Sequence, residues 1–182
     1  MSLVLRETRE TQVRVELQSG TVDEGAAIDT SIRFLDHMLA TFARYAGLDC
    51  RIQARGDLRH HVVEDVGICV GAALAELVPA TAVRYGDRTV PMDDALVHGA
   101  LDLGGRPYYR GPLPSPLYDH WMRSFADHAR ATLHLRVLRG TDRHHIVEAS
   151  FKVLGLVVRE AIADRGAVFS TKGTVSLRSG ST

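Results

Sequence analysis

The chemistry that this sequence can support is clearest in two copies of the pattern His-His-x-x-Glu, whose imidazoles and carboxylate are common ligands of transition metals. The residues of the two copies are His60, His61, Glu64, His144, His145 and Glu148. On a helix, residues four positions apart share a face, so the first histidine and the glutamate of each copy can bind one ion. The second histidine lies roughly 100° around the helix and would face another ion. Each copy therefore predicts half of a two-metal site.

The two copies belong to a longer internal repeat. FLDHMLATFA followed by RGDLRHHVVEDVGICVG aligns with LYDHWMRSFA followed by RGTDRHHIVEASFKVLG, at an offset of 83 residues that becomes 84. Besides the paired histidines, the alignment matches His37 with His120 and Gly71 with Gly155. The chain is therefore predicted to consist of two related halves.

Repeat symmetry predicts how the metal ligands are shared. Each ion would take the His/Glu pair of one helix, the second histidine of the other helix, and one of the Asp-His histidines. The first predicted set is His37, His61, His144 and Glu148, and the second is His60, Glu64, His120 and His145. Several imidazoles with one carboxylate suit manganese, iron or zinc, and the spacing does not distinguish these metals. A chance cluster is disfavoured because gathering so many histidines without a shared ligand would cost desolvation of each.

Other residues near these positions have simpler expected roles. Asp36 and Asp119 directly precede the two Asp-His histidines and are expected either to orient the adjacent elements or to cap a helix. His98, His128 and His134 have no counterpart in the repeat and are interpreted as ordinary strand, helix or surface histidines.

Hydrophobic patterns predict the elements that must position the ligands. Period-two alternation predicts strands at 12–17, 48–54, 95–103 and 132–138. Helices are predicted at 35–46, 60–79, 118–130 and 144–164, and the Pro/Gly-rich stretch 104–116 is predicted to connect the halves. Each half, about 1–85 and 86–182, would be a strand-strand-helix-strand-helix unit. The expected fold is an α+β tandem duplication forming one domain, 1–182, with two four-stranded sheets and helices packed between them or on one face.

Composition excludes several classes of function. Basic and acidic residues number 22 each, which argues against binding to nucleic acid or to an anionic membrane. No run of 18 apolar residues predicts a membrane span, and the N-terminus lacks the apolar core of a signal peptide. Cys50 and Cys69 are predicted to be small buried core residues rather than a disulfide framework. A cytoplasmic protein with a small-molecule partner is expected.

Nine short motifs, which follow one another along the chain, indicate a family resemblance. They are RETRET, FLDHML, HHVVED, RYGD, PMDDAL, DLGGRP, DHWMRSF, HHIVEASFK and STKG. In these blocks the sequence resembles the imidazoleglycerol-phosphate dehydratase family over nearly its whole length. The resemblance implies a fold like that of ribosomal protein S5 domain 2. Two segments are shorter than in the common family form, one ahead of His60 and one between Arg106 and His120.

The resemblance also implies functional residues. The family's ligands for two manganese ions per active site fall on the residues that the repeat selects, namely His37, His60, His61, Glu64, His120, His144, His145 and Glu148. Its phosphate-binding residues fall on Arg84, Arg106, Ser170 and Lys172, whose side chains suit a phosphate dianion. Glu10 falls where the family has an acid/base glutamate beside the substrate. The residues expected to take part in catalysis are Glu10, His61, Glu64, His145 and Glu148.

The reaction that the resemblance implies is the dehydration of D-erythro-1-(imidazol-4-yl)glycerol 3-phosphate to imidazole-acetol phosphate in L-histidine biosynthesis. Two Mn²⁺ ions would hold the substrate imidazole as imidazolate, and loss of hydroxide would give a diazafulvene-like intermediate. Glu10 would transfer the proton, with a metal-bound water as an alternative. The phosphate-binding residues would fix the distance to the metals. The resemblance further implies a 24-subunit homo-oligomer with active sites between subunits and metal-dependent assembly.

Two other functions are compatible with the ligand pattern alone. A di-metal hydrolase would use the ions to activate water, but it favours a site rich in Asp and Glu with a bridging carboxylate. In a non-catalytic metal-binding or storage assembly, Glu10 and the phosphate-binding residues would have no reason to converge on the metals. The positions of these residues relative to the ligands therefore discriminate between the alternatives.

Overall fold

The two halves of the chain fold into equivalent sets of strands and helices. The computed structural model describes residues 1–20 and 27–168. The first half contains β1 (Ser2–Glu7), β2 (Thr11–Ser19), β3 (Ile28–Asp29), α1 (Arg33–Ala46), β4 (Leu48–Gly56) and α2 (Arg59–Leu77). The second half contains β5 (Tyr85–Met92), β6 (Ala95–Asp102), β7 (Tyr108–Arg110), α3 (Pro116–His128), β8 (Thr132–Arg139) and α4 (Arg143–Ala161). The strand orders β1-β2-β4-β3 and β5-β6-β8-β7 correspond position by position.

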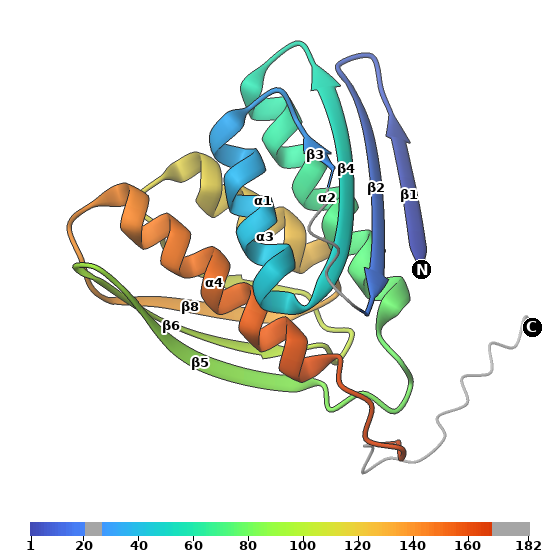
Figure 1. Cartoon of the computed structure of the whole chain (residues 1–182), viewed down its shortest axis with the longest axis vertical. Helices are drawn as coiled ribbons and strands as arrows, with labels where there is room; N and C mark the ends of the chain where they lie inside the picture. The colour runs from blue at the N-terminus through green and yellow to red at the C-terminus, as the bar shows by residue number, and fades with distance from the viewer. Residues whose placement is uncertain (21–26, 169–182) are drawn as a thin grey trace, which may run out of the picture.

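The helices lie between the two sheets (Figure 1). On the first sheet, α2 packs against β1, β2 and β4, and α1 packs against β3 and β4. On the second sheet, α4 packs against β5 and β6, and α3 packs against β7. The halves meet through the helices, because α1 packs on α4 and α2 packs on α3. The predicted α+β arrangement of two four-stranded sheets is confirmed.

Residue alternation along the strands explains why each sheet is covered on one face only. In β2, Val13, Val15 and Leu17 are buried against the helices, whereas the intervening Gln12 and Arg14 are exposed. A strand places successive side chains on opposite faces, so this pattern gives one apolar and one polar face. The helices therefore occupy the inner faces and the outer faces meet solvent in this chain.

Two glycines allow the helices of different halves to approach closely. A Cβ on Gly71 of α2 would lie 2.4 Å from the Phe125 carbonyl oxygen of α3, and a Cβ on Gly155 of α4 would lie 2.7 Å from the Phe42 carbonyl oxygen of α1. Gly67 of α2 likewise faces Trp121, four residues before Phe125, so α2 and α3 run in the same direction. Each long helix thus begins beside the beginning of a short helix from the other half.

The structure also differs from the sequence predictions in detail. Strands β3 and β7 were not predicted, because two and three residues are too short to show a period. They pair in parallel with β4 and β8. The stretch 104–116 was predicted to connect the halves, but it lies within the second half, between β6 and α3, and contains β7. The halves are joined instead by the segment between α2 and β5, residues 78–84.

The aspartates before the Asp-His histidines do not cap their helices. The N-cap residues are Ile32 and Ser115. Asp36 instead accepts hydrogen bonds from the backbone and hydroxyl of Thr30, at 2.8 and 2.5 Å, and Asp119 accepts one from the Tyr109 hydroxyl at 2.7 Å. Both carboxylates reach back from the first helical turn, so they tie the preceding segment to the helix. The orienting role is the one observed.

Further sequence predictions can be compared directly with the fold. Cys50 and Cys69 are free and buried, as predicted. Within residues 1–20 and 27–168, no helix combines the length and the apolar character that crossing a membrane requires.

Candidate metal centre

The first group of possible metal ligands lies where α1 and α4 begin. His37 Nε2 is 3.4 Å and His144 Nε2 is 3.2 Å from the same oxygen, Glu148 Oε2. Asp142 fixes the start of α4 by accepting hydrogen bonds from the backbone of His144 and His145, as an N-cap residue does. One ligand atom from each of His37, His144 and Glu148 lies within 4.8 Å of the others, so the three can hold one ion.

The second group repeats this geometry where α2 and α3 begin. His60 Nε2 is 3.6 Å and His120 Nε2 is 3.3 Å from Glu64 Oε2. His120 Nε2 is buried and makes no hydrogen bond within the part of the chain that the structure describes. A buried polar nitrogen without a hydrogen bond is costly, and a cation bound between His120 Nε2 and Glu64 Oε2 would satisfy it. His60, Glu64 and His120 therefore form a second possible site for an ion.

Each group combines the two halves of the chain. Both take a His/Glu pair from the first turns of a long helix and one histidine from the short helix of the other half. The parallel contacts of α1 with α4 and of α2 with α3 produce this sharing. The structure thus brings together three of the four members of each predicted ligand set.

The fourth member of each set lies apart from the group. His61 Nδ1 is 2.8 Å from Asp57 Oδ1 and 3.6 Å from Glu10 Oε2. His145 Nδ1 is 2.8 Å from Asp94 Oδ1, on the hairpin between β5 and β6. Both rings are partly exposed, and neither contributes an atom to the groups of ligands gathered within this chain.

These aspartates change the titration of the two histidines. The hydrogen bond to Asp57 raises the pKa of His61, against a smaller lowering by burial. The hydrogen bond to Asp94 raises the pKa of His145 in the same way. Because a ligand imidazole must be neutral, an ion that binds either ring has to displace a proton that the aspartate stabilises.

The two groups are not identical, because among the described residues a lysine pairs with Glu148 and none pairs with Glu64. Lys152 Nζ lies 3.0 Å from Glu148 Oε1, one helical turn further along α4. Burial raises the pKa of Glu148, but the hydrogen bonds and charges of Lys152 and His37 outweigh burial and hold that pKa below its usual value. The repeat places Ile68 at the corresponding position of α2, so Glu64 has no such neighbour there.

Sequence reasoning missed three residues of this region, Asp57, Asp94 and Lys152. The spacing of four residues between Glu148 and Lys152 is a signal that could have identified the ion pair. Asp94 lies in the block PMDDAL, but its pairing with His145 gives no local signal, because the two are 51 residues apart and meet only through the fold. The three histidines without repeat partners lie outside both groups, and His98, for example, pairs with Thr89.

Glu10 lies at the same end of the molecule as the metal groups. It occupies the turn between β1 and β2, close to His61 at the start of α2. Its carboxylate side chain is 60% exposed. The structure thus brings Glu10 near the candidate metal centre within one chain.

Arg84 and Arg106 converge with each other but lie far from the metal groups. Their Nη2 atoms are 3.0 and 3.3 Å from the carboxylate of Asp102. The backbone N–H of Arg84 donates to the carbonyl of Ala161 at the end of α4, whereas His144 is at its beginning. These 17 residues span about 25 Å at roughly 1.5 Å per residue. Ser170 and Lys172 lie outside the described residues.

A hollow adjoins this distant end of the helices. It has a volume of about 370 Å³ and is lined by Arg84, Arg130 and the loop residues Gly104 and Gly105, among others. We call Arg84 and Arg106, which meet at Asp102, the arginine cluster. The metal groups and the arginine cluster therefore occupy opposite ends of the helical layer of one chain.

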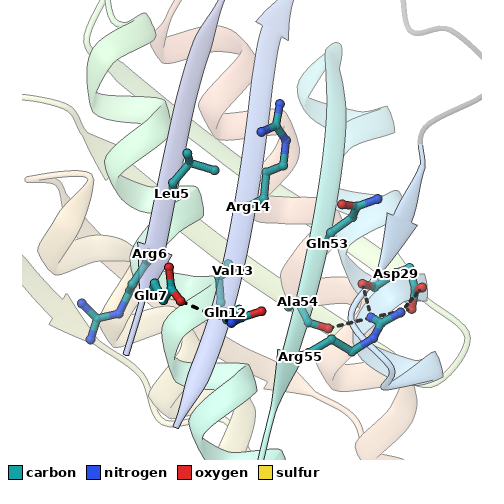
Figure 2. Close-up of a pocket in the computed structure, with 10 residues that line it drawn as sticks. All are labelled: Leu5, Arg6, Glu7, Gln12, Val13, Arg14, Asp29, Gln53, Ala54 and Arg55. Carbon is teal, nitrogen blue, oxygen red and sulfur yellow. Dashed lines mark hydrogen bonds and ion pairs between the residues drawn. The ribbon is translucent and has the colours of Figure 1, made fainter. Parts of the chain in front are cut away.

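Figure 2 shows a larger hollow, of about 510 Å³, on the outer face of the first sheet. At this hollow, the Arg55 guanidinium donates a hydrogen bond to the Asp29 carboxylate, and the Gln12 amide donates one to the Glu7 carboxylate at 3.4 Å (Figure 2). None of the residues that line this hollow belongs to either metal group. The outer face of the sheet therefore does not provide the metal centre.

Comparisons with known proteins all point to one family. The family model described as imidazoleglycerol-phosphate dehydratase matches residues 30–158. A protein of that name from Pyrobaculum calidifontis is 48% identical, over 93% of this chain and 97% of its own length. Another from Desulforudis audaxviator is 46% identical, over 95% of this chain and 96% of its own.

Solved structures with this name have the same fold. The crystal structure of the Pyrococcus furiosus protein in complex with (S)-C348 matches with a TM-score of 0.83 at 40% identity, covering 94% of this chain and all of that one. The Staphylococcus aureus structure matches with a TM-score of 0.77 at 31% identity, covering 90% and 98%. Sequence and structure comparisons thus point to the same group of proteins.

Proposed function

Because this chain belongs to the imidazoleglycerol-phosphate dehydratase family, we propose that its two groups of histidine and glutamate residues hold the metal ions of that reaction. The chain is a hydro-lyase that removes water from imidazoleglycerol phosphate in histidine biosynthesis. The observation that carries the proposed site is the convergence of two imidazole nitrogens on one carboxylate oxygen, which occurs twice.

We propose Mn²⁺ as the metal, with two ions in each active site. Two imidazoles and one carboxylate form a donor set that manganese accepts, and an ion would satisfy the buried Nε2 of His120, which makes no hydrogen bond among described residues. When bound, the ions supply Lewis acidity toward the imidazole of the substrate. The family is metal-dependent, and the residues of this chain fit that requirement.

The remaining chemistry falls to side chains of the protein. Dehydration removes a proton from one carbon of the substrate and a hydroxyl from the next. Glu10 is the proposed acid/base group, because its exposed carboxylate lies at the metal end, 3.6 Å from His61. A general acid or base must lie within reach of the proton that it moves, and the turn between β1 and β2 gives Glu10 this position.

The phosphate of the substrate is the proposed ligand of Arg84 and Arg106, together with Ser170 and Lys172. Asp102 holds both guanidinium groups side by side, so they are oriented before the phosphate binds. Guanidinium groups donate paired hydrogen bonds to phosphate oxygens, which fixes orientation as well as charge.

This proposal requires more than one copy of the chain in each active site. About 25 Å separates the arginines from the metal groups of one chain, estimated from the rise of α4, and the three-carbon chain between imidazole and phosphate is far shorter. We therefore propose that the arginines of one subunit meet the metal groups of another, in a 24-subunit assembly. His61 and His145, which belong to neither group within one chain, would complete the metal sites between subunits.

We also propose that the enzyme works in the cytoplasm. The free, buried thiols of Cys50 and Cys69 are in keeping with a reducing compartment.

The test is an assay of the purified protein with imidazoleglycerol phosphate, after chelation and again after Mn²⁺ is restored. We expect imidazole-acetol phosphate only in the restored sample. Its absence from both samples would overturn the proposal. Sedimentation of the same samples tests the assembly, because we expect smaller species after chelation, and an unchanged particle size would contradict metal-dependent assembly.

A further inference from the structure

A buried carboxylate on α2 is connected to the turn that carries Glu10. Asp65 is only 7% exposed, although it is charged. Its Oδ1 lies 3.0 Å from Arg6 Nε, at the end of β1, and its Oδ2 accepts a hydrogen bond from the Thr11 hydroxyl, at the start of β2. Asp65 therefore contacts both strands that flank Glu10, and it does so from the helix that carries His60, His61 and Glu64.

The turn itself is fixed by a second hydroxyl. Thr8 Oγ1 accepts hydrogen bonds from the backbone N–H groups of Glu10 and Thr11, at 3.1 and 2.9 Å. The hydroxyls of Thr8 and Thr11 lie 3.1 Å apart, and the backbone N–H of Thr8 donates to the Thr11 carbonyl at 2.9 Å. The hydrogen bonds run without a break from the Asp65 carboxylate through Thr11 and Thr8 to the backbone of Glu10.

The end of β4 presses against the same turn. The carbonyl of Glu10 accepts a hydrogen bond from the backbone N–H of Asp57 at 3.0 Å. A Cβ on Gly56 would lie 2.9 Å from Thr11 Cγ2 and 3.0 Å from the Glu10 carbonyl oxygen. The turn is therefore held closely on two sides, by α2 and by β4.

We propose that Asp65 is a positioning residue, which acts through Thr11 to set the location of the Glu10 carboxylate relative to the metal groups. The inference rests on the proposed role of Glu10. Because α2 carries the ligands as well as Asp65, any movement of this helix carries the ligands and the Glu10 turn together. A displacement of about 1 Å of a reacting group can lower a rate on the order of 100-fold, so such a coupling has a catalytic consequence.

The test removes the Thr11 hydroxyl rather than Asp65, because loss of the carboxylate would leave Arg6 without its buried ion-pair partner. Thr11→Val has nearly the same shape but cannot donate to Asp65, and Thr11→Ser is the matched control that can. We expect Thr11→Val to lower kcat about 10-fold, with unchanged KM and metal content, and Thr11→Ser to stay within about twofold of the original kcat.

The discriminating step repeats Thr11→Val in a Glu10→Gln background, where the residual turnover is measured at high enzyme concentration. If Thr11 acts through Glu10, the substitution lowers kcat in the original protein and adds no further loss in the Glu10→Gln variant. Equal fold losses in both backgrounds would reveal a general structural effect and overturn the inference.

Three further outcomes separate the inference from the proposed function. Full activity of Glu10→Gln would refute the role of Glu10 and, with it, the positioning role of Asp65. A strong loss in Glu10→Gln combined with unchanged kcat in Thr11→Val would overturn the positioning role alone. Should Thr11→Val fail to fold, Thr11→Ala takes its place; a loss of kcat that disappears in the Glu10→Gln background then supports the inference, and an equal loss in both backgrounds refutes it.

Discussion

At the scale of single residues, the candidate centre consists of imidazole nitrogens that face one carboxylate oxygen in each group. The repeat in the sequence was sufficient to select these histidines and glutamates, because the same His-His-x-x-Glu pattern is not expected twice by chance at equivalent positions. It was not sufficient to place His61 and His145, whose neighbours Asp57 and Asp94 come from a loop and a hairpin. Arg84 and Arg106 had no signal of their own and were selected only by family resemblance.

The glutamates provide the first prediction. We expect Glu64→Gln and Glu148→Gln each to lose about half of the bound metal, because an amide is a weaker ligand than a carboxylate, and to lower turnover at least about 100-fold. Metal analysis of the dialysed protein measures the first effect and a product assay the second. Glu16→Gln, on the outer face of β2, is the control and should bind the full amount of metal. Full metal content in both ligand variants would contradict the assignment.

At the scale of elements, the site depends on two parallel helix contacts between the halves. The helix ranges could be predicted to within a few residues, because the long helices have clear patterns and equivalent positions in the repeat. The contacts of α1 with α4 and of α2 with α3 could not be predicted, since nothing in a local pattern shows which helices meet. The short strands β3 and β7 were missed for the related reason that their pairing is with distant residues.

Gly71 tests the contact between α2 and α3. Alanine favours a helix over glycine by about 1 kcal/mol, but its Cβ would lie 2.4 Å from the Phe125 carbonyl oxygen, and such overpacking costs about 1–3 kcal/mol. We therefore expect Gly71→Ala to lower the free energy of unfolding and to weaken metal binding by the His60 group on the same helix pair. Denaturant unfolding and metal titration measure these effects. Arg44→Ala, exposed on α1, should change neither, and a stabilised Gly71→Ala variant would disprove the close contact.

The link between β7 and α3 gives a pH-dependent prediction. Burial, and then the hydrogen bond to Asp119, raise the pKa of Tyr109 above its ordinary value of 10.0. A group whose pKa is raised in the folded state contributes stability below its unfolded pKa, and that contribution declines as the pH rises through and above 10.0. Tyr109→Phe should lose about 1.5 kcal/mol at neutral pH, as expected for a hydrogen bond to a charged group.

The difference in stability between the original protein and Tyr109→Phe should shrink above pH 10, because the variant has no phenol to ionise. Urea unfolding at a series of pH values measures both curves. A difference that stayed constant or grew with pH would show that the hydroxyl is not held protonated by its surroundings.

At the scale of the whole molecule, the metal groups and the arginine cluster occupy opposite ends of the helical layer. This separation appears only once the helices are placed, so the sequence could name both sets of residues without indicating that one chain keeps them apart. It also changes how the alternatives are weighed, because among the described residues Glu10 lies near the metal groups, whereas Arg84 and Arg106 do not. The proposed assembly, in which the arginines of one subunit meet the metal groups of another, would account for the distance.

Shared sites predict complementation between inactive variants. His144→Ala removes a metal ligand and Arg84→Ala removes a phosphate contact, so each assembly alone should be inactive or nearly so. When the two variants are co-expressed, some active sites combine an intact metal group from one chain with an intact arginine from another. We expect mixed assemblies to recover up to about a quarter of the original activity, by random mixing of two subunit types. No recovery in particles proven to be mixed would argue that each site lies within one chain.

The crossing of ligands between halves also bears on how the chain arose. A single half supplies a His/Glu pair for one ion and a lone histidine for the other, so it cannot complete either group by itself. An ancestor consisting of one half would have bound metal only as a pair of identical polypeptides related by a twofold axis. Gene duplication and fusion would then have joined two copies that already needed each other to bind metal. The difference between Lys152 and Ile68, which occupy equivalent positions, would have arisen after the two halves were joined.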